Sequence, residues 1–194
     1  MTDTTIQKPY LDRLERLYAR MDGRYREVAD HYGFHCRGCE DNCCRTTFYH
    51  HTVVEYLYLK VGFQTLAPQV RSEVRQLAQK VMAQPSGGLF CPLCRDGRCL
   101  LYDHRPMICR LHGIAHELHR PDRGVSYGPG CAEFEAAAKG KPEIAFDRTE
   151  FYWDLSTLER DTRAALGVTQ KIKMTVSQMV TANSGGDVQE GPRP

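Results

Sequence analysis

The chain has 194 residues, of which 41% are hydrophobic and 26% are charged, and this is the composition of a globular protein rather than of a disordered or membrane-embedded one. Its formal net charge of +2 is too small to indicate the basic surface of a nucleic-acid-binding protein. No stretch reaches the roughly 18 consecutive apolar residues of a membrane span, and the first residues lack the apolar core of a secretory signal. We therefore expect a cytoplasmic protein with no membrane association and no clear signal for nucleic acid.

The first predicted element is a long amphipathic helix over residues 9–32. Apolar side chains recur there at spacings of three and four, with charged residues between them, and include Leu11, Leu14, Leu17, Met21 and Val28. Gly23 lies inside this pattern and costs about 1 kcal/mol relative to alanine in a helix, which makes it the candidate point for a kink. Residues 1–33 are thus predicted to form an N-terminal amphipathic helix.

Two more helices are predicted before the second group of cysteines. Thr52 and Glu55 form a capping-box pattern, which predicts a helix over residues 53–61. Pro68 suits the first turn of the next helix, whose apolar face includes Val70, Val74 and Leu77. Residues 85–88 (PSGG) are expected to end it.

The remaining chain alternates loops and shorter helices. Pro106 predicts the start of a helix that carries Cys109, and residues 119–130 are expected to be a loop. Residues 131–139 are predicted to form a short helix, and a cap at residues 147–150 predicts the start of a longer one. The expected fold is mainly α, a small single domain with helices around an irregular cysteine-rich metal-binding core and a short hairpin or knuckle. Within it, residues 34–140 are the cysteine-cluster domain, residues 141–181 a helical segment packing on it, and residues 182–194 a disordered tail.

Nine cysteines are the most informative feature of the sequence. Four lie within residues 36–44, four lie within residues 91–109, and Cys131 follows. The reducing cytosol and the odd number argue against a closed disulfide framework. Because thiolates are the ligands that zinc and iron–sulfur clusters prefer, the pattern predicts a metal site.

Spacing within the first segment separates strong candidates from open ones. Cys36 and Cys39 are two residues apart, so both can reach one metal from a single tight turn. Adjacent side chains tend to diverge, so Cys43 and Cys44 are expected to face different directions. Which of these two ligates is left open, and one of them is equally well interpreted as a small buried hydrophobe.

In the second segment, the Asp96-Gly97 pair suits a tight turn. Such a turn would fold Cys94 and Cys99 back towards each other as a short hairpin or knuckle. For Cys94, a metal ligand and a buried structural cysteine are equal alternatives.

Arginines and histidines accompany the cysteines. A site of four thiolates that holds zinc or a [4Fe–4S] core carries a formal charge of about −2, and the guanidinium groups of nearby arginines could offset it. The equal alternative is that these arginines are ordinary solvated side chains. A continuous helix would place His112, His116 and His119 on one face, although solvated or hydrogen-bonding histidines are the commoner outcome of that spacing. His35 and His104 are further candidates because each lies near a cysteine.

At these residues the sequence resembles the YkgJ-type cysteine-cluster family, also described as a CxxCxxCC zinc- or iron-chelating domain. The likeness runs through Cys36-Arg37-Gly38-Cys39, Cys43-Cys44 and the run CLLYDHRPMICR at residues 99–110, which looks like the family pattern C-x-I-Y-x-x-R-P-x-x-C-R. The chain has three residues rather than two between Cys39 and Cys43, and Cys94 is an addition. The resemblance implies eight metal ligands: Cys36, Cys39, Cys43, Cys44, Cys91, Cys99, Cys109 and Cys131.

Two functions of different classes follow. The first is an iron–sulfur protein, of the [4Fe–4S] type, that serves redox or cluster-assisted chemistry with a redox or protein partner that the sequence does not name. The second is a non-catalytic zinc module in which the metal serves fold stability and partner binding. A related cysteine pattern in the flagellin lysine methylases also implies methyl transfer, but the sequence carries no methyl-donor motif. Whether the protein is an enzyme is left open.

Overall fold

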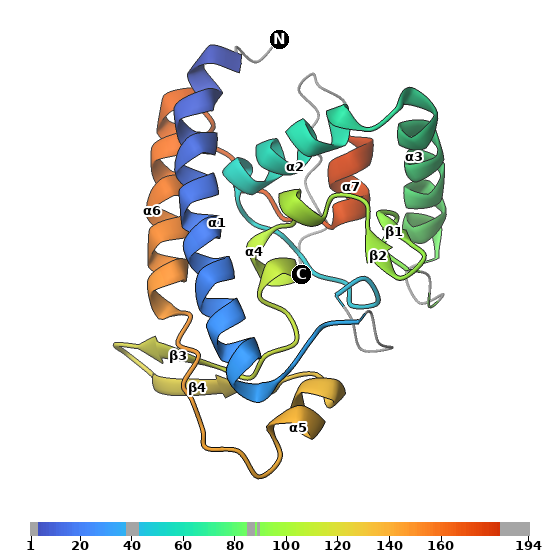
Figure 1. Ribbon diagram of the computed structural model, residues 1–194. Helices are drawn as coiled ribbons and strands as arrows, with labels where there is room; N and C mark the ends of the chain where they lie inside the picture. Colours follow the sequence, from blue (N-terminus) through green and yellow to red (C-terminus); the bar gives the residue numbers. More distant parts are fainter. Residues whose placement is uncertain (1–3, 38–42, 85–87, 89, 183–194) are drawn as a thin grey trace.

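The computed structural model describes residues 4–37, 43–84, 88 and 90–182, and within them the chain is mainly helical. Its elements, in chain order, are α1 Thr4–Tyr32, α2 Val53–Thr65, α3 Pro68–Ala83, β1 Cys94–Arg95, β2 Arg98–Cys99, the 3-10 helix η1 Tyr102–His104, α4 Met107–Arg110, β3 His116–Arg120, β4 Gly124–Gly128, α5 Ala132–Ala138, α6 Thr149–Leu166 and α7 Val176–Thr181 (Figure 1). None of the described helices is long and apolar enough to cross a membrane. Residues 183–194 of the predicted tail lie outside the described residues.

The two longest helices, α1 and α6, lie side by side along one edge of the molecule (Figure 1). Leu14, Met21 and Leu155 are buried in the core that these helices share. Each such side chain contributes about 1.5–3 kcal/mol on full burial, so the apolar stripe seen in the sequence accounts for the pairing. At the rim, the Arg13 guanidinium lies 2.9 Å from the Asp161 carboxylate and links the two helices.

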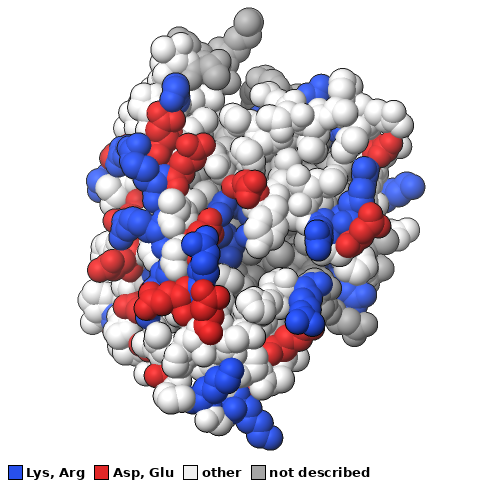
Figure 2. All heavy atoms as spheres, viewed as in Figure 1, with Lys and Arg blue, Asp and Glu red and all other residues white. Residues whose placement is uncertain are grey.

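The outer face of α1 is charged. Figure 2 shows acidic and basic side chains interspersed over this helix, as expected for a solvated face. Gly23 faces open space there, and α1 runs through it without a break. The predicted helix is therefore confirmed, begins at Thr4 rather than at residue 9, and has no break at Gly23.

Helices α2, α3 and α7 form the other part of the molecule (Figure 1). Leu59 and Phe63 of α2, Val74 and Ala78 of α3, and Met179 of α7 are buried together in a second core. The predicted helix at residue 53 is confirmed and extends to Thr65, and the helix predicted from Pro68 begins there. The C-terminal segment thus divides between the two cores, with α6 on α1 and α7 on α2 and α3.

Thr52 precedes α2 as the capping-box pattern predicts, but the capping box itself does not form. The Thr52 hydroxyl instead donates to Glu55 Oε2 at 2.5 Å. Glu55 Oε1 accepts from the Tyr18 hydroxyl at 2.8 Å and from the backbone N–H of Met107 at 2.7 Å. A buried carboxylate must be hydrogen-bonded, and Glu55 meets that need with partners on α1 and α4 rather than with the backbone of its own helix.

The hairpin predicted around Asp96-Gly97 is confirmed. Strands β1 and β2 are antiparallel, and Cys94 pairs with Cys99. Asp96 and Gly97 both have positive φ, 53° and 76°, which is the conformation of a two-residue turn that matches the twist of its strands. The mainly helical class is confirmed as well, with two small antiparallel hairpins in the described residues.

The second hairpin corrects the loop that was expected at residues 119–130. It also removes the continuous helix that would have placed His112, His116 and His119 on one face, because His116–Arg120 is strand β3 and pairs with β4. Helix α4 ends at Arg110, and Gly113 adopts a φ of 102°, which no helix continues through. The prediction failed because β3 (HELHR) has a single apolar residue. In β4, Val125 and Tyr127 alternate with small residues, but both are exposed and lie in a stretch rich in glycine.

Candidate metal centre

The two cysteine segments meet in space. The backbone N–H of Cys91 donates to the carbonyl oxygen of Cys44 at 2.7 Å. Next to this contact, five cysteines line one cavity of about 20 Å³: Cys43, Cys44, Cys91, Cys99 and Cys109. They come from the turn at residues 43–45, the stretch before β1, strand β2 and helix α4. The fold therefore gathers five of the eight predicted ligands around one space.

Local backbone bonds explain why the second segment turns towards this cavity. The N–H of Cys94 donates to the carbonyl of Cys91 at 2.8 Å, and the N–H of Leu100 donates to the carbonyl of Leu93 at 2.8 Å. These bonds fold residues 91–100 into a knuckle closed by the hairpin turn. Leu93 is buried in the second core, and Cys91 and Cys99 pack against the same core, so apolar packing anchors the knuckle and holds these two cysteines at the cavity.

Helix α4, which carries Cys109, is held at both ends by buried charges. Glu55 accepts the N–H of Met107 at its start. At its end, Arg110 Nη1 donates to Asp22 Oδ2 at 2.5 Å, and Arg110 Nη2 donates to the carbonyl of Asp103 at 2.6 Å. A four-residue helix has little stability of its own, so these contacts from α1, α2 and η1 fix the position of Cys109.

Contacts between the thiols polarise them. Hydrogen bonds from Cys109 and from Cys44 lower the pKa of Cys43 to about 3. The same hydrogen bonds raise the pKa of the two donors, Cys44 and Cys109. Burial raises the pKa of Cys91 to about 12. Cys43 is therefore the sulfur in this group at which negative charge is best stabilised, with two neighbouring thiols as donors.

Among the arginines near the cysteines, Arg105 lines the cavity. Its Nε donates to the carbonyl of Tyr102 at 2.8 Å, and its guanidinium lies 3.5 Å from the centre of the Tyr102 ring. Burial raises the pKa of Cys99, whereas the backbone of Leu101 and the Arg105 charge oppose that rise. Arg110 and Arg95 are instead paired with Asp22 and Glu73. Arg105 is thus the arginine whose charge acts on the thiols of the cavity, lowering the pKa of Cys43 and of Cys99.

Cys36, Cys94 and Cys131 do not line this cavity. Cys36 is exposed, and Cys131 is buried in the first core. Both lie close to Tyr25. Burial is the main reason that the pKa of Tyr25 is raised, and Cys36 and Cys131 add to that rise. Cys94 is half-buried on β1. Cys39 lies outside the described residues.

Of the candidate histidines, His104 lines the cavity. Its ring stacks on Tyr58 with centroids 4.7 Å apart and fills the space above Gly62, where an added Cβ would lie 2.3 Å from His104 Cγ. His112 packs against the Phe48 ring at 5.7 Å. His119 pairs with Glu117 on β3 at 2.7 Å. His112 and His119 therefore do not share a helical face, and His119 takes the hydrogen-bonding role that its spacing favoured.

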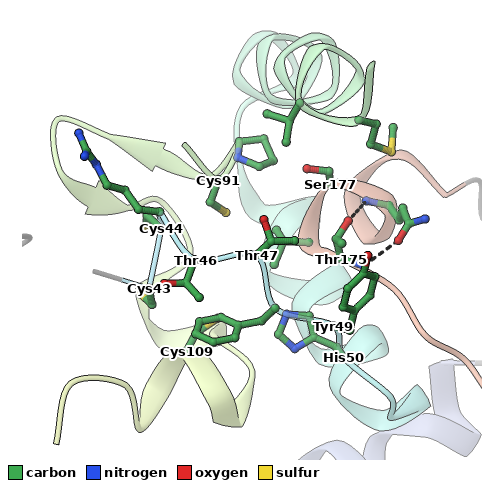
Figure 3. A pocket seen from close by; sticks show the side chains of 17 residues that line it. Cys43, Cys44, Thr46, Thr47, Tyr49, His50, Cys91, Cys109, Thr175 and Ser177 are labelled. Carbon is green, nitrogen blue, oxygen red and sulfur yellow. Dashed lines mark hydrogen bonds between the residues drawn. The ribbon is translucent and has the colours of Figure 1, made fainter. Parts of the chain in front are cut away.

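A larger pocket of about 260 Å³ opens beside the same thiols (Figure 3). Cys43, Cys44, Cys91 and Cys109 line both spaces. The remaining walls are residues 45–50, the end of α3, Pro92 and residues 175–178. Sequence reasoning missed this pocket because its walls are distant in the chain. The Thr175 to Gln178 spacing is a capping-box pattern that could have located α7, but no signal places α7 beside residues 45–50.

The donor set suits a thiophilic metal by its chemistry. Sulfur atoms line the small cavity, and no carboxylate does so among the described residues. Within that same part of the chain, however, no group of three or more His, Cys, Asp or Glu side chains is arranged so that it could hold a metal ion. Binding a metal here therefore requires the thiols to converge on it.

Comparison with known proteins identifies no relative. No family model matches the chain, and neither the curated proteins nor the solved structures contain a significant match.

Proposed function

We propose that this protein binds a thiophilic metal cofactor at the cysteine centre, and that the first candidate is an iron–sulfur cluster, of the [4Fe–4S] type, used for redox or cluster-assisted chemistry. The observation that carries this proposal is the gathering of five thiols from separate segments around one cavity. Cysteines that serve only as small buried hydrophobes have no reason to meet. Five sulfurs also exceed the four that one zinc ion uses.

Specific residues would take specific roles. Cys43, Cys99 and Cys109 would supply thiolates from the turn, β2 and α4, with Cys44 and Cys91 as further donors. Arg105 would offset part of the negative charge of the ligand set. An iron–sulfur cluster supplies one-electron redox chemistry. The proposal includes a reducing compartment such as the cytoplasm, because the thiols must stay reduced to ligate.

Zinc in a non-catalytic module is the second candidate, and two observations favour it. The knuckle at residues 91–94 leads directly into the hairpin that pairs Cys94 with Cys99, and closely spaced thiols on such a turn are typical of structural zinc sites. The cavity of about 20 Å³ has room for one water-sized sphere, which suits a single ion better than a four-iron core.

The likeness to the YkgJ-type family supports the same cofactor class and proposes Cys36, Cys39 and Cys131 as additional ligands. Cys36 and Cys131 do not line the cavity, so we place these two second, whereas Cys39 lies outside the described residues. Methyl transfer rests on the likeness to the flagellin lysine methylases alone.

Purification without oxygen tests the proposal. An iron–sulfur protein should be brown, contain iron and acid-labile sulfide, and bleach on reduction. Stoichiometric zinc without iron or sulfide would reject the redox function and support the structural module. Protein that is fully reduced yet holds neither metal, even after reconstitution with each, would reject the metal proposal as a whole.

A further inference from the structure

We propose that the rim of the larger pocket beside the cysteines is a docking surface for an acidic segment of a partner protein, whose carboxylates would meet Arg45 and Lys173 and whose apolar side chain would pack on the exposed rings beside them. The inference goes beyond the metal centre, because it rests on side chains at the rim and on none of the thiols.

Three large apolar side chains are exposed around the opening of this pocket. Tyr49 and Met82 line it and are 52% and 37% exposed. Phe90 is 38% exposed and lies beneath the guanidinium of Arg45, which lines the pocket as well. Single exposed apolar residues are ordinary, but aromatic side chains and methionine gathered around one hollow are the composition found at the centre of protein interfaces. Surface of this kind indicates a partner that covers it.

A cation lies over each of the two exposed rings. The Arg45 guanidinium is 4.6 Å from the centroid of Phe90, and Lys173 Nζ is 4.6 Å from the centroid of Tyr49. Figure 3 shows Tyr49 and Cys44, the residue before Arg45, on opposite sides of the pocket. Within the described part of the chain, neither cation is in an ion pair and no carboxylate lines the pocket. The rings therefore hold two charges at the rim that are available to the carboxylates of a partner.

The charge of the surrounding part of the chain favours an acidic partner. Residues 43–105 and 168–182, which carry α2, α3, the β1–β2 hairpin and α7, hold ten Lys and Arg but four Asp and Glu, and one of those four, Glu55, is buried. The whole chain has 26 Lys and Arg against 24 Asp and Glu, so the positive excess is concentrated here. Glu40 and Asp41, outside the described residues, would still leave an excess of four. Figure 2 shows more basic than acidic side chains on the side that carries α3 and the β1–β2 hairpin. Such an excess attracts acidic partners and orients them.

An acidic protein segment fits this surface better than a nucleic acid does. A nucleic-acid strand gains most of its affinity from a row of phosphate contacts, and two cations on opposite sides of an apolar opening form no such row. The carboxylates fit at the rim rather than inside the pocket, because thiolate charge would repel them from a wall that contains the sulfurs of Cys43, Cys44, Cys91 and Cys109.

Fluorescence polarisation of the full chain, as purified, with three labelled peptides tests this inference. The acidic peptide Asp-Glu-Phe-Glu-Asp should bind roughly fivefold more tightly than Asn-Gln-Phe-Gln-Asn, which has the same shape without the charges, since two exposed ion pairs are worth about that factor. It should also bind more tightly than Asp-Glu-Ala-Glu-Asp, which lacks the aromatic ring. Raising the salt concentration to about 1 M should remove the first difference.

Charge reversal at the rim locates the site. Arg45→Glu combined with Lys173→Glu should abolish the preference for the acidic peptide. Arg16→Glu combined with Arg26→Glu makes the same change in net charge at exposed positions of α1 and should preserve that preference. Met82→Ser should reduce the advantage of the phenylalanine peptide over the alanine peptide, because it removes part of the exposed apolar surface.

Three results would overturn the inference. They are equal affinity of the unmodified protein for the acidic and the amide peptide, a preference that survives the charge reversal at the rim, and tighter binding of a short oligothymidylate than of the acidic peptide, which would assign the surface to nucleic acid. The peptide comparison on the unmodified protein decides even if a variant fails to fold. Metal content of the same sample, measured by elemental analysis, judges the metal proposal separately.

Discussion

Arg110 Nη1 lies 2.5 Å from Asp22 Oδ2, and this ion pair joins the residue after Cys109 to the long helix α1. The Arg110 guanidinium also lies 4.2 Å from the centre of the Tyr18 ring. Arg110 is buried, so its charge depends on these partners. The helix that presents Cys109 therefore cannot shift without leaving a buried cation unpaired.

Removing the charge at Asp22 should destabilise the fold. We expect Asp22→Asn to lower the free energy of unfolding by about 2 kcal/mol, less than for a fully enclosed pair because Asp22 is partly exposed. Asp12→Asn is the matched control, since Asp12 on the same helix pairs with the exposed Lys8 at 2.8 Å and should cost below about 0.5 kcal/mol. Urea unfolding measures both. Equal losses would mean that the Arg110 contact has no special role.

Cysteine variants separate ligands from packing residues. Cys109→Ser should remove most of the bound metal, because Cys109 lines the cavity and an alcohol is a poor ligand for a soft metal. Cys131→Ser should keep the metal and instead lower the stability by about 1–2 kcal/mol, because it puts a hydroxyl into the first core. Metal content per chain is the measurement. A comparable loss of metal in both variants would make Cys131 a ligand, as the family likeness implies.

Stability should fall in mild acid, partly through His116. Burial, followed by the charge of Arg148, lowers the pKa of His116 to about 4. The unfolded chain takes up this proton near pH 6.5, so the contribution of His116 is complete above about pH 6.5 and is lost as the pH falls towards 4. His116→Gln should therefore show a smaller drop in urea midpoint between pH 7 and pH 4.5. An unchanged drop would assign the acid sensitivity to other groups.

The parts of the fold that were predictable depend on local signals. The Asp96-Gly97 turn was predictable because the conformation at two adjacent residues sets the hairpin and brings Cys94 opposite Cys99. Strand β3 was not predictable from the sequence, because its structure depends on its pairing with β4 and not on an apolar pattern of its own. Glu55 could be placed near a helix start, but its buried partners Tyr18 and Met107 depend on tertiary packing.

The same limit applies to the site. Spacing predicted that the cysteines belong together, and the structure gathers five of them around one cavity. Spacing could not predict that Cys36 and Cys131 lie near Tyr25 instead. It also could not predict the larger pocket, because His50 and Met174 meet through an isolated bridge between segments that are far apart in the sequence.

Two helical glycines allow a sharp test of how α2 supports the centre. An added Cβ at Gly62 would lie 2.3 Å from Cγ of His104, whose ring stacks on Tyr58. His104 precedes Arg105, and both line the cysteine cavity. Gly62→Ala should therefore displace η1, cost about 1–3 kcal/mol through overpacking and lower the metal content.

Gly23→Ala is the matched control for that change. Gly23 lies inside α1 with no atom within 4 Å of an added Cβ, so alanine should stabilise the helix by about 0.5–1 kcal/mol and leave the metal content unchanged. Thermal melts and elemental analysis of the two variants give the comparison. The same substitution should thus have opposite signs at the two positions, because only Gly62 is needed to admit a neighbouring side chain. A stabilised Gly62→Ala protein with full metal content would show that the position of His104 does not matter to the centre.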